Sequence, residues 1–141
     1  MSGELPIKRL DAAAVLPTRA HADDAGLDLY GLEDATIASG AGALLRTGVA
    51  VAVPAGHVGL VCDRSSLARR GLKTAGGVID AGYRGELGVV VWNLSSEAQS
   101  VKKGERIAQL LIVPIATPAP VERMELDATV RGAGGFGSTG R

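Results

Sequence analysis

The chain has 141 residues, which is the length of one ordinary domain, and 46% of them are apolar but only 3% aromatic. Its 15 basic and 15 acidic side chains balance, which argues against a broad nucleic-acid or membrane surface but leaves room for a small anionic ligand. The single cysteine, Cys62, cannot form an internal disulfide, and no Cys/His cluster has zinc spacing. The N-terminal segment lacks an apolar signal core, so we expect a soluble, reducing, cytoplasmic setting.

Short apolar or alternating segments follow one another along the chain, separated by segments with turn chemistry. The predicted strands are 6–10, 25–31, 43–54, 57–64, 86–94, 105–115 and 121–126. Between them "SSLARRG" has a serine start, good helix formers and a stop at Gly71, so it predicts a single short helix. The regular spacing and the 20 glycines favour an all-β sandwich or barrel without βαβ units.

The helix start combines three groups that suit an anion. Arg64, Ser65 and Ser66 lie where the short helix begins, so a guanidinium, two hydroxyls and free backbone N–H groups are expected there. The alternative is an ordinary Ser-capped helix.

Residues 76–88, "GGVIDAGYRGELG", look like a hairpin with Asp80 and Tyr83 near its tip. Gly76, Gly77 and Gly88 would let the backbone lie close to a ligand, and the aspartate would act as a general base beside a stacking surface. The alternative is a turn-forming aspartate and a surface tyrosine.

Two polar residues interrupt apolar strands. Asp28 lies between two leucines, where strand alternation points it away from their face, and Gln109 interrupts "ERIAQLLIVPI". Solvent exposure would explain each of them alone. His21 and His57 have no partners at metal or triad spacing, and we interpret both as surface residues.

The C-terminal segment "RGAGGFGSTGR" holds the only phenylalanine, Phe136, among five glycines. Such a segment has high backbone entropy and few side chains for a core, so Phe136 is expected to pack against a group that arrives later. The segment matches G-x-G-x-x-G, but a dinucleotide site needs a following helix, and only four residues follow Gly137. Arg131, the backbone N–H groups and the ring suit phosphates and a flat base, and a disordered terminus is the alternative.

Five segments, in this order, resemble the five motifs of the homotrimeric, all-β dUTP pyrophosphatases (dUTPases). They are "AGLDLY", "RSSLA", "GVIDAGYRGELG", "GERIAQL" and "RGAGGFGSTG", and they span residues 25 to 140. The resemblance implies a distorted jelly-roll or β-clip barrel over residues 1–125. It also implies a mobile arm over residues 126–141 that closes over a neighbouring subunit's site. Three subunits would assemble around a threefold axis, and each site would draw on all three.

The resemblance also implies Mg²⁺-dependent hydrolysis of dUTP to dUMP and pyrophosphate by water attack at the α-phosphorus. This reaction keeps uracil out of DNA and supplies dUMP for thymidylate synthesis. Asp80 would activate the water and contact the 3′-hydroxyl, and Tyr83 would exclude a 2′-hydroxyl. The triphosphate would hold Mg²⁺, with Asp28 reaching it only through water.

The resemblance implies further contacts to the uracil base and to the phosphates of the substrate. The backbone of Gly76, Gly77, Val78, Ile79 and Gly88 would read uracil, and the ring of Phe136 would stack on it. The phosphate ligands would be Arg64, Ser65, Ser66 and Gln109, and the arm would add Arg131, Gly137, Ser138 and Thr139. Arg131, like Asp80 and Asp28, would also be catalytic, because an arginine delivered to the γ end of the triphosphate would raise the rate.

Three positions depart from the family pattern. Asp63 stands where the family usually has Pro, and Ser66 where it usually has Gly. The added carboxylate would either weaken phosphate binding or pair with Arg64. Near Thr74 the chain lacks the base-contacting Asn of many bacterial members, so uracil selection would rest on backbone groups.

Two other functions compete with this reading. The related dCTP deaminases need a catalytic Glu on the strand after the hairpin, where this chain has Val90. A catalytically silent trimer that binds nucleotide or a protein partner is the second alternative.

Overall fold

The computed structural model describes residues 3–137, which contain eleven strands and one helix. The first six strands are β1 (Ile7–Arg9), β2 (Leu27–Tyr30), β3 (Ala35–Ile37), β4 (Gly42–Arg46), β5 (Val49–Val51) and β6 (His57–Cys62). The helix α1 (Ser65–Arg69) follows, and then β7 (Leu72–Ala75), β8 (Val78–Ile79), β9 (Gly88–Asn93), β10 (Gln99–Val101) and β11 (Arg106–Pro114). No helix among these residues is long and apolar enough to cross a membrane.

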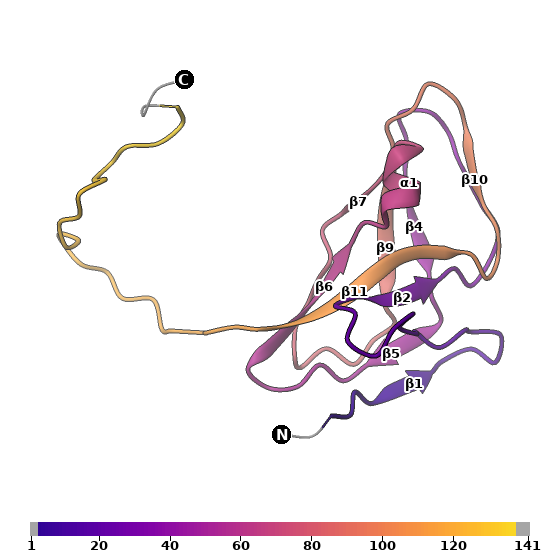
Figure 1. Ribbon diagram of the computed structural model, residues 1–141, viewed down its shortest axis with the longest axis horizontal. Helices are drawn as coiled ribbons and strands as arrows, with labels where there is room; N and C mark the ends of the chain where they lie inside the picture. Colours follow the sequence, from indigo (N-terminus) through magenta and orange to yellow (C-terminus); the bar gives the residue numbers. More distant parts are fainter. Residues whose placement is uncertain (1–2, 138–141) are drawn as a thin grey trace.

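The strands form antiparallel sheets that wrap around one interior (Figure 1). A four-stranded sheet has the order β2-β11-β6-β8, a three-stranded sheet has the order β4-β9-β7, and β1-β5 and β3-β10 form two short pairs. The all-β class with one short helix is confirmed, and the sheets are those of a distorted jelly roll. The described strands form separate sheets and do not close into one continuous barrel.

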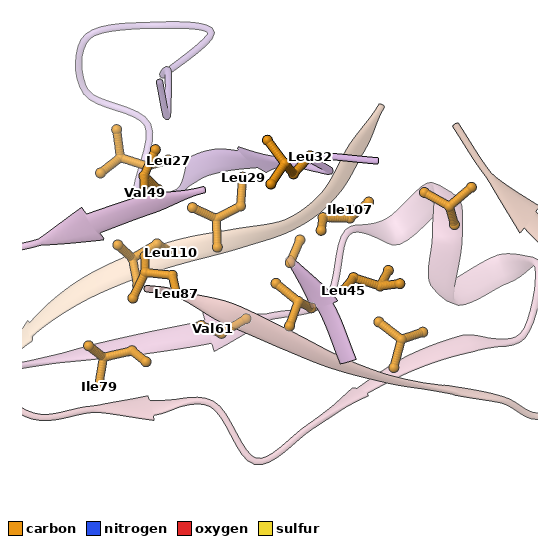
Figure 2. Close-up of a cluster of buried hydrophobic side chains, with 14 of the residues drawn as sticks. Leu27, Leu29, Leu32, Leu45, Val49, Val61, Ile79, Leu87, Ile107 and Leu110 are labelled. Carbon is orange, nitrogen blue, oxygen red and sulfur yellow. The ribbon is translucent and has the colours of Figure 1, made fainter. Parts of the chain in front are cut away.

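The core lies between the sheets and is aliphatic, as the composition predicts. Leu29 on β2, Val61 on β6 and Leu110 on β11 lie in one cluster with Leu45 on β4 (Figure 2). Among the described residues, no aromatic side chain belongs to this cluster. Burying aliphatic side chains contributes about 1.5–3 kcal/mol each, so alternation along the strands fixes which face of each strand turns inward.

One predicted strand and one predicted turn have different boundaries in the structure. Residues 43–54 form two strands, β4 and β5, because the chain turns at Gly48, which has a φ of 73°. The Thr47 hydroxyl donates to the Leu87 carbonyl at 2.6 Å and fixes this turn. Residues 95–99, interpreted as a turn, instead lead into β10, which begins at Gln99.

The predicted hairpin over residues 76–88 is wrong in its pairing. β8 pairs with β6, whereas β9 pairs with β4 and β7, so the two strands belong to different sheets. The segment between them is therefore a loop that joins two sheets, with Asp80 and Tyr83 on it.

The predicted strand 121–126 does not form. Beyond β11 the chain runs away from the body (Figure 1), and Val121, Met124 and Leu126 are exposed. The apolar pattern of this segment therefore finds no partner within its own chain among the described residues.

Candidate active site

Five of the predicted ligand residues line one pocket. It is formed by Asp28 on β2, Arg64, Ser65 and Ser66 at the start of α1, and Gln109 on β11. We call it the polar pocket. Residues from three separate segments of the sequence meet here, which neither strand alternation nor helix capping alone would have shown.

The β2–β11 ladder aligns two members of the polar pocket. Gln109 lies directly opposite Asp28 on β2 and opposite Cys62 on β6. Gly26 makes room for this arrangement, because a Cβ atom at that position would overlap the Gln109 side-chain oxygen Oε1. Gln109 is thus held within the sheet while its side chain reaches the end of β6.

The carboxylate of Asp28 lies between two guanidiniums. Arg64 Nε is 3.5 Å from Oδ1, and Arg106 Nε is 3.7 Å from Oδ2. The Asp28 side chain is 18% exposed, so these cations interact with it in a partly shielded position. The polar pocket is thus bordered by two arginines that a bound anion could share with Asp28.

Sequence reasoning missed Arg106. A register shift between Arg106 and Ala108 adds a residue to β11, so that Ile107 and Ala108 are both buried. This bulge turns Arg106 toward the face of Gln109, three residues later. The only signal in the sequence is the pair of consecutive apolar residues between two polar ones.

The start of α1 differs from the Ser-capped alternative. Arg64 is the N-cap residue, and no side chain caps the helix. Arg64 Nη1 donates to the Ser66 hydroxyl at 3.4 Å, which links two of the predicted ligands. The serine side chains therefore do not cap the helix but line the polar pocket, where their hydroxyls can donate hydrogen bonds to an anion.

The loop between β8 and β9 forms a second pocket, the loop pocket. Its lining residues are Leu44, Val78, Ile79, Asp80, Tyr83, Glu86 and Gly88. Five of them were predicted from sequence. Asp80 is exposed, and its backbone carbonyl accepts a 3.1 Å hydrogen bond from the Tyr83 backbone N–H, which closes the turn.

The Tyr83 ring is fixed by its own loop. Its hydroxyl donates to the Glu86 carbonyl at 2.7 Å. The ring lies over Gly85, where a Cβ atom would come within 2.6 Å of the ring carbon Cζ. This aromatic surface beside Asp80 is therefore set before any ligand binds.

Glu86 anchors the far side of the loop. Its carboxylate accepts two 3.1 Å hydrogen bonds from Arg46 and one of the same length from the Gly48 backbone N–H. The Arg46 bond and charge lower the pKa of Glu86, and the Gly48 bond adds to this effect against partial burial. The carboxylate thus stays ionised and ties the loop to the β4–β5 turn.

Gly76 and Gly77 lie just before β8 and do not line the loop pocket. Both have positive φ, 74° and 91°. At Gly77 a Cβ atom would come within 2.8 Å of the Val61 carbonyl oxygen, so the close approach of this segment to β6 requires glycine. The Gly77 carbonyl in turn accepts the Val61 N–H at 2.8 Å.

The arm residues lie apart from both pockets. Arg131 Nε donates to the Gly134 carbonyl at 2.7 Å, and Phe136 is fully exposed. Neither Arg131, Phe136 nor Gly137 lines either pocket, and the predicted ligands Ser138 and Thr139 lie outside the described residues. Phe136 does not pack in its own core, as predicted, and the two pockets share no residue.

The sequence model of the dUTPase family matches residues 12–140. The chain belongs to the dUTPase family. It is 50% identical to the deoxyuridine 5'-triphosphate nucleotidohydrolase of Mycobacterium tuberculosis over an alignment that covers 99% of this chain and 97% of the relative.

Solved dUTPase structures have the same fold. The dUTPase of Staphylococcus bacteriophage 80alpha with dUPNHPP has a TM-score of 0.93 and 34% identity, covering 99% of this chain and 100% of that one. A point mutant of the dUTPase from phage phi11 of S. aureus has a TM-score of 0.81 and 31% identity, covering 86% of this chain and 97% of that one. That structure is described as revealing the coordination of a structural Mg(II) ion.

The departure of this dUTPase family member at Asp63 has a clear structural setting. Asp63 does not pair with Arg64, so that expectation is wrong. Its Oδ2 accepts a 2.7 Å hydrogen bond from Lys73 Nζ. Its Oδ1 accepts two hydrogen bonds from Thr74, one from the backbone N–H and one from the hydroxyl, both 2.7 Å long. Partial burial acts to raise the pKa of Asp63, but the bonds from Lys73 and Thr74 outweigh it and lower the pKa.

Proposed function

We propose that this chain hydrolyses dUTP to dUMP and pyrophosphate by attack of water at the α-phosphorus. The observation that carries the proposal is the grouping of Asp28, Arg64, Ser65, Ser66 and Gln109 in one pocket of a dUTPase family member. The reaction keeps uracil out of DNA and supplies dUMP, and we infer that it takes place in the reducing cytoplasm, where the free thiol of Cys62 is stable.

Asp80 is the general base in this proposal. It is exposed on a loop whose geometry is fixed from both sides, by the Tyr83 hydrogen bond to Glu86 and by the Glu86 contacts with Arg46. A positioned carboxylate that accepts a proton from water contributes about 10²–10⁴ in rate. Tyr83 lies against the deoxyribose and leaves no room for a 2′-hydroxyl.

The polar pocket holds the phosphates. Arg64 supplies a guanidinium, Ser65 and Ser66 supply hydroxyls, and Gln109 supplies a side-chain amide. Hydrolysis at the α-phosphorus places negative charge on the departing pyrophosphate, so fixed donors around it stabilise the transition state.

The donor set fits a magnesium ion that arrives with its substrate. The described residues contain no group of three His, Cys, Asp or Glu side chains arranged for a metal, and Asp28 is the one carboxylate of the polar pocket. Mg²⁺ supplies charge neutralisation to the triphosphate oxygens. Asp28 would reach the ion only through water, with its carboxylate held by Arg64 and Arg106.

We propose that three copies assemble and share their sites. Strand alternation leaves apolar side chains on the outer face of β4 and β9, where Leu44 is 65% and Trp92 is 46% exposed, with Val90 beside them. An exposed apolar surface of this kind favours burial against another chain. Leu44 and the exposed Val78 also line the loop pocket, so that pocket adjoins the surface to be covered.

We propose that residues 126–141 form an arm that closes over a neighbouring subunit's site, beside a body of residues 1–125. Val130 and Phe136 are fully exposed in the single chain, and Arg131 has only its own segment for a partner among the described hydrogen bonds. Stacking of Phe136 on uracil contributes about 1–3 kcal/mol by analogy with other base–aromatic contacts. Arg131, Gly137, Ser138 and Thr139 then close on the phosphates.

The deaminase alternative is disfavoured by the residue on the strand after the loop. Val90 on β9 is an apolar residue that cannot carry a proton. Uracil selection instead rests on the backbone of Gly76, Gly77, Val78, Ile79 and Gly88.

Hydrolysis in water labelled with heavy oxygen tests the proposed reaction. Incubation of dUTP with Mg²⁺ and the protein should give labelled dUMP and unlabelled pyrophosphate, because the water oxygen joins the α-phosphorus. Labelled inorganic phosphate with dUDP would show attack at the γ-phosphorus and would contradict the proposal.

Mixing two poorly active variants tests the shared site. Asp80→Asn removes the base but keeps the arm, and a chain truncated before Arg131 keeps Asp80 but lacks the arm. If one site uses Asp80 and the arm from different chains, mixed assemblies regain activity. Mixed trimers, verified by mass, that stay inactive would place the whole site in one chain.

A further inference from the structure

Asp63 lies at the corner between β6 and α1, directly before the phosphate ligands Arg64, Ser65 and Ser66. All three hydrogen bonds to its carboxylate come from the neighbouring strand β7, two from Thr74 and one from Lys73. The Asp63 side chain is 28% exposed and Thr74 is buried, so these bonds are partly shielded from water. The corner is thereby fastened to β7.

The backbone of the same residue holds another phosphate ligand. Gln109 Nε2 donates to the Asp63 carbonyl oxygen at 2.8 Å. Gly26 provides the space for the Gln109 side chain on its other side. A shift of Asp63 would therefore move Arg64 and Gln109 together, although they lie on different elements.

The negative charge of Asp63 is balanced before any phosphate binds. Lys73 Nζ contacts both Asp63 Oδ2 at 2.7 Å and the Thr74 carbonyl at 2.9 Å, so the ammonium is held in place. An ion pair that is nearly neutral repels a nearby anion much less than a free carboxylate does. This pairing argues against weakened phosphate binding, which was one of the two alternatives for Asp63.

We propose that Asp63 is a positioning residue for the triphosphate, which it serves by fastening Arg64 and Gln109 to β7 through Thr74 and Lys73. This inference rests on the proposed function, because it names how the phosphate ligands of that site are held. Asp63 touches no substrate in this account. It acts through the two residues that do.

The test measures the affinity of purified full-length protein for the dUTP analogue dUpNHpp and for dUMP by calorimetry. In Asp63→Ala the affinity for dUpNHpp should fall about tenfold, the effect of losing charge-assisted hydrogen bonds. The affinity for dUMP, which has a single phosphate, should change by no more than about twofold. Steady-state kinetics should show a raised KM for dUTP.

Asp34→Ala is the matched control. Asp34 Oδ1 accepts the backbone N–H of Lys103 at 2.7 Å, so it also fastens a turn, but it lines neither pocket. The control should lose thermal stability without losing affinity for dUpNHpp. An Asp63→Ala protein that behaves like this control would overturn the proposal and reduce Asp63 to a structural role.

Thr74→Val keeps the test decisive if Asp63→Ala does not fold. Valine has nearly the shape of threonine and removes only the hydroxyl donor, so affinity for dUpNHpp should fall about threefold. Asp63→Asn keeps an acceptor oxygen for Thr74, so its affinity for dUpNHpp should lie between those of the wild type and Asp63→Ala. Unchanged affinity in Thr74→Val would overturn the proposal.

The wild-type titration separates the two levels of the account. A wild-type protein that fails to bind dUpNHpp would overturn the proposed function and this inference with it. A wild type that binds, with an Asp63→Ala variant that binds equally well, would overturn the inference alone.

Discussion

Gln109 faces Asp28 across the β2–β11 ladder, and both side chains reach the polar pocket. The register shift just before this pair adds Arg106 to the same face. Without the bulge, a residue three positions from Gln109 would point to the opposite side of the sheet. A local irregularity of one strand thus gives the pocket its second arginine.

Removing Arg106 should weaken substrate binding more than stability. Arg106→Gln deletes one of the two cations beside Asp28, and we expect KM for dUTP to rise about tenfold with a smaller change in kcat. Arg106→Lys keeps the positive charge but lacks the planar guanidinium, so its KM should lie between those of the wild type and Arg106→Gln. Steady-state kinetics measure KM and kcat, with Arg9→Gln on β1 as the control. A KM in Arg106→Gln equal to that of the control would contradict the role of Arg106.

Replacing the proposed base should separate chemistry from binding. Asp80→Asn keeps the size of the side chain but cannot take a proton, so turnover should fall by at least about 10²-fold while dUTP binding stays measurable. Rapid-mix kinetics and calorimetry measure the two properties. Asp23→Asn, at an exposed position outside both pockets, is the control. Near-normal turnover in Asp80→Asn would show that the base assignment is wrong.

Deletion of residues 131–141 should leave a folded trimer that hydrolyses dUTP poorly. The described part of this segment contributes nothing to the hydrophobic core, so the body should keep its unfolding temperature. Sedimentation and circular dichroism measure assembly and folding beside activity. Dissociation into monomers would mean that the segment is structural.

In the full chain, Phe136→Ala should cause a modest loss of dUTP hydrolysis, and Phe136→Trp should give a fluorescence change with a substrate analogue.

The two adjacent glycines before β8 should differ in their tolerance of a side chain. Gly77→Ala should lower the free energy of unfolding by about 3 kcal/mol, because it combines positive φ with a clash against the Val61 carbonyl. Gly76→Ala meets no atom within 4 Å and should cost about 1 kcal/mol from its φ alone. Denaturant unfolding at fixed protein concentration compares them. Equal losses would contradict the close approach of Gly77 to β6.

Glu86 should make folding stability depend on pH in the acid range. Its pKa in the folded protein lies below the ordinary value of 4.5, so its contribution is fully present above that pH. The contribution is lost as the pH falls from 4.5 through the lowered pKa. The difference in unfolding free energy between wild type and Glu86→Gln should therefore shrink over this window. A difference that stays constant would show that Glu86 is not stabilised by Arg46.

Much of the fold could be predicted from sequence because alternation and turn residues are local signals. The helix at Ser65–Arg69 follows from its composition and Gly71. The wrong predictions concern which strand pairs with which. Nothing local in residues 76–88 shows that β8 pairs with β6 and β9 with β4, and residues 121–126 have a strand pattern without a partner in their own chain.

The candidate site shows the same division. Asp28, Arg64 and Gln109 could be named individually from the motifs they share with the dUTPase family, and the structure brings them together. The role proposed for Asp63 could not be read from sequence, because its partners Lys73 and Thr74 lie ten and eleven residues away on another strand. Arg106 was missed because a bulge changes the facing of a strand without changing its composition.

Pyrophosphate release from dUTP with Mg²⁺, measured beside dCTP, dTTP and UTP, tests the central claim most directly. We predict rapid release from dUTP alone, with dUMP formed in equal amount. Ammonia from dCTP would move the chain to the deaminases. A folded trimer that turns over none of the four nucleotides would contradict the proposed hydrolysis and leave a binding protein.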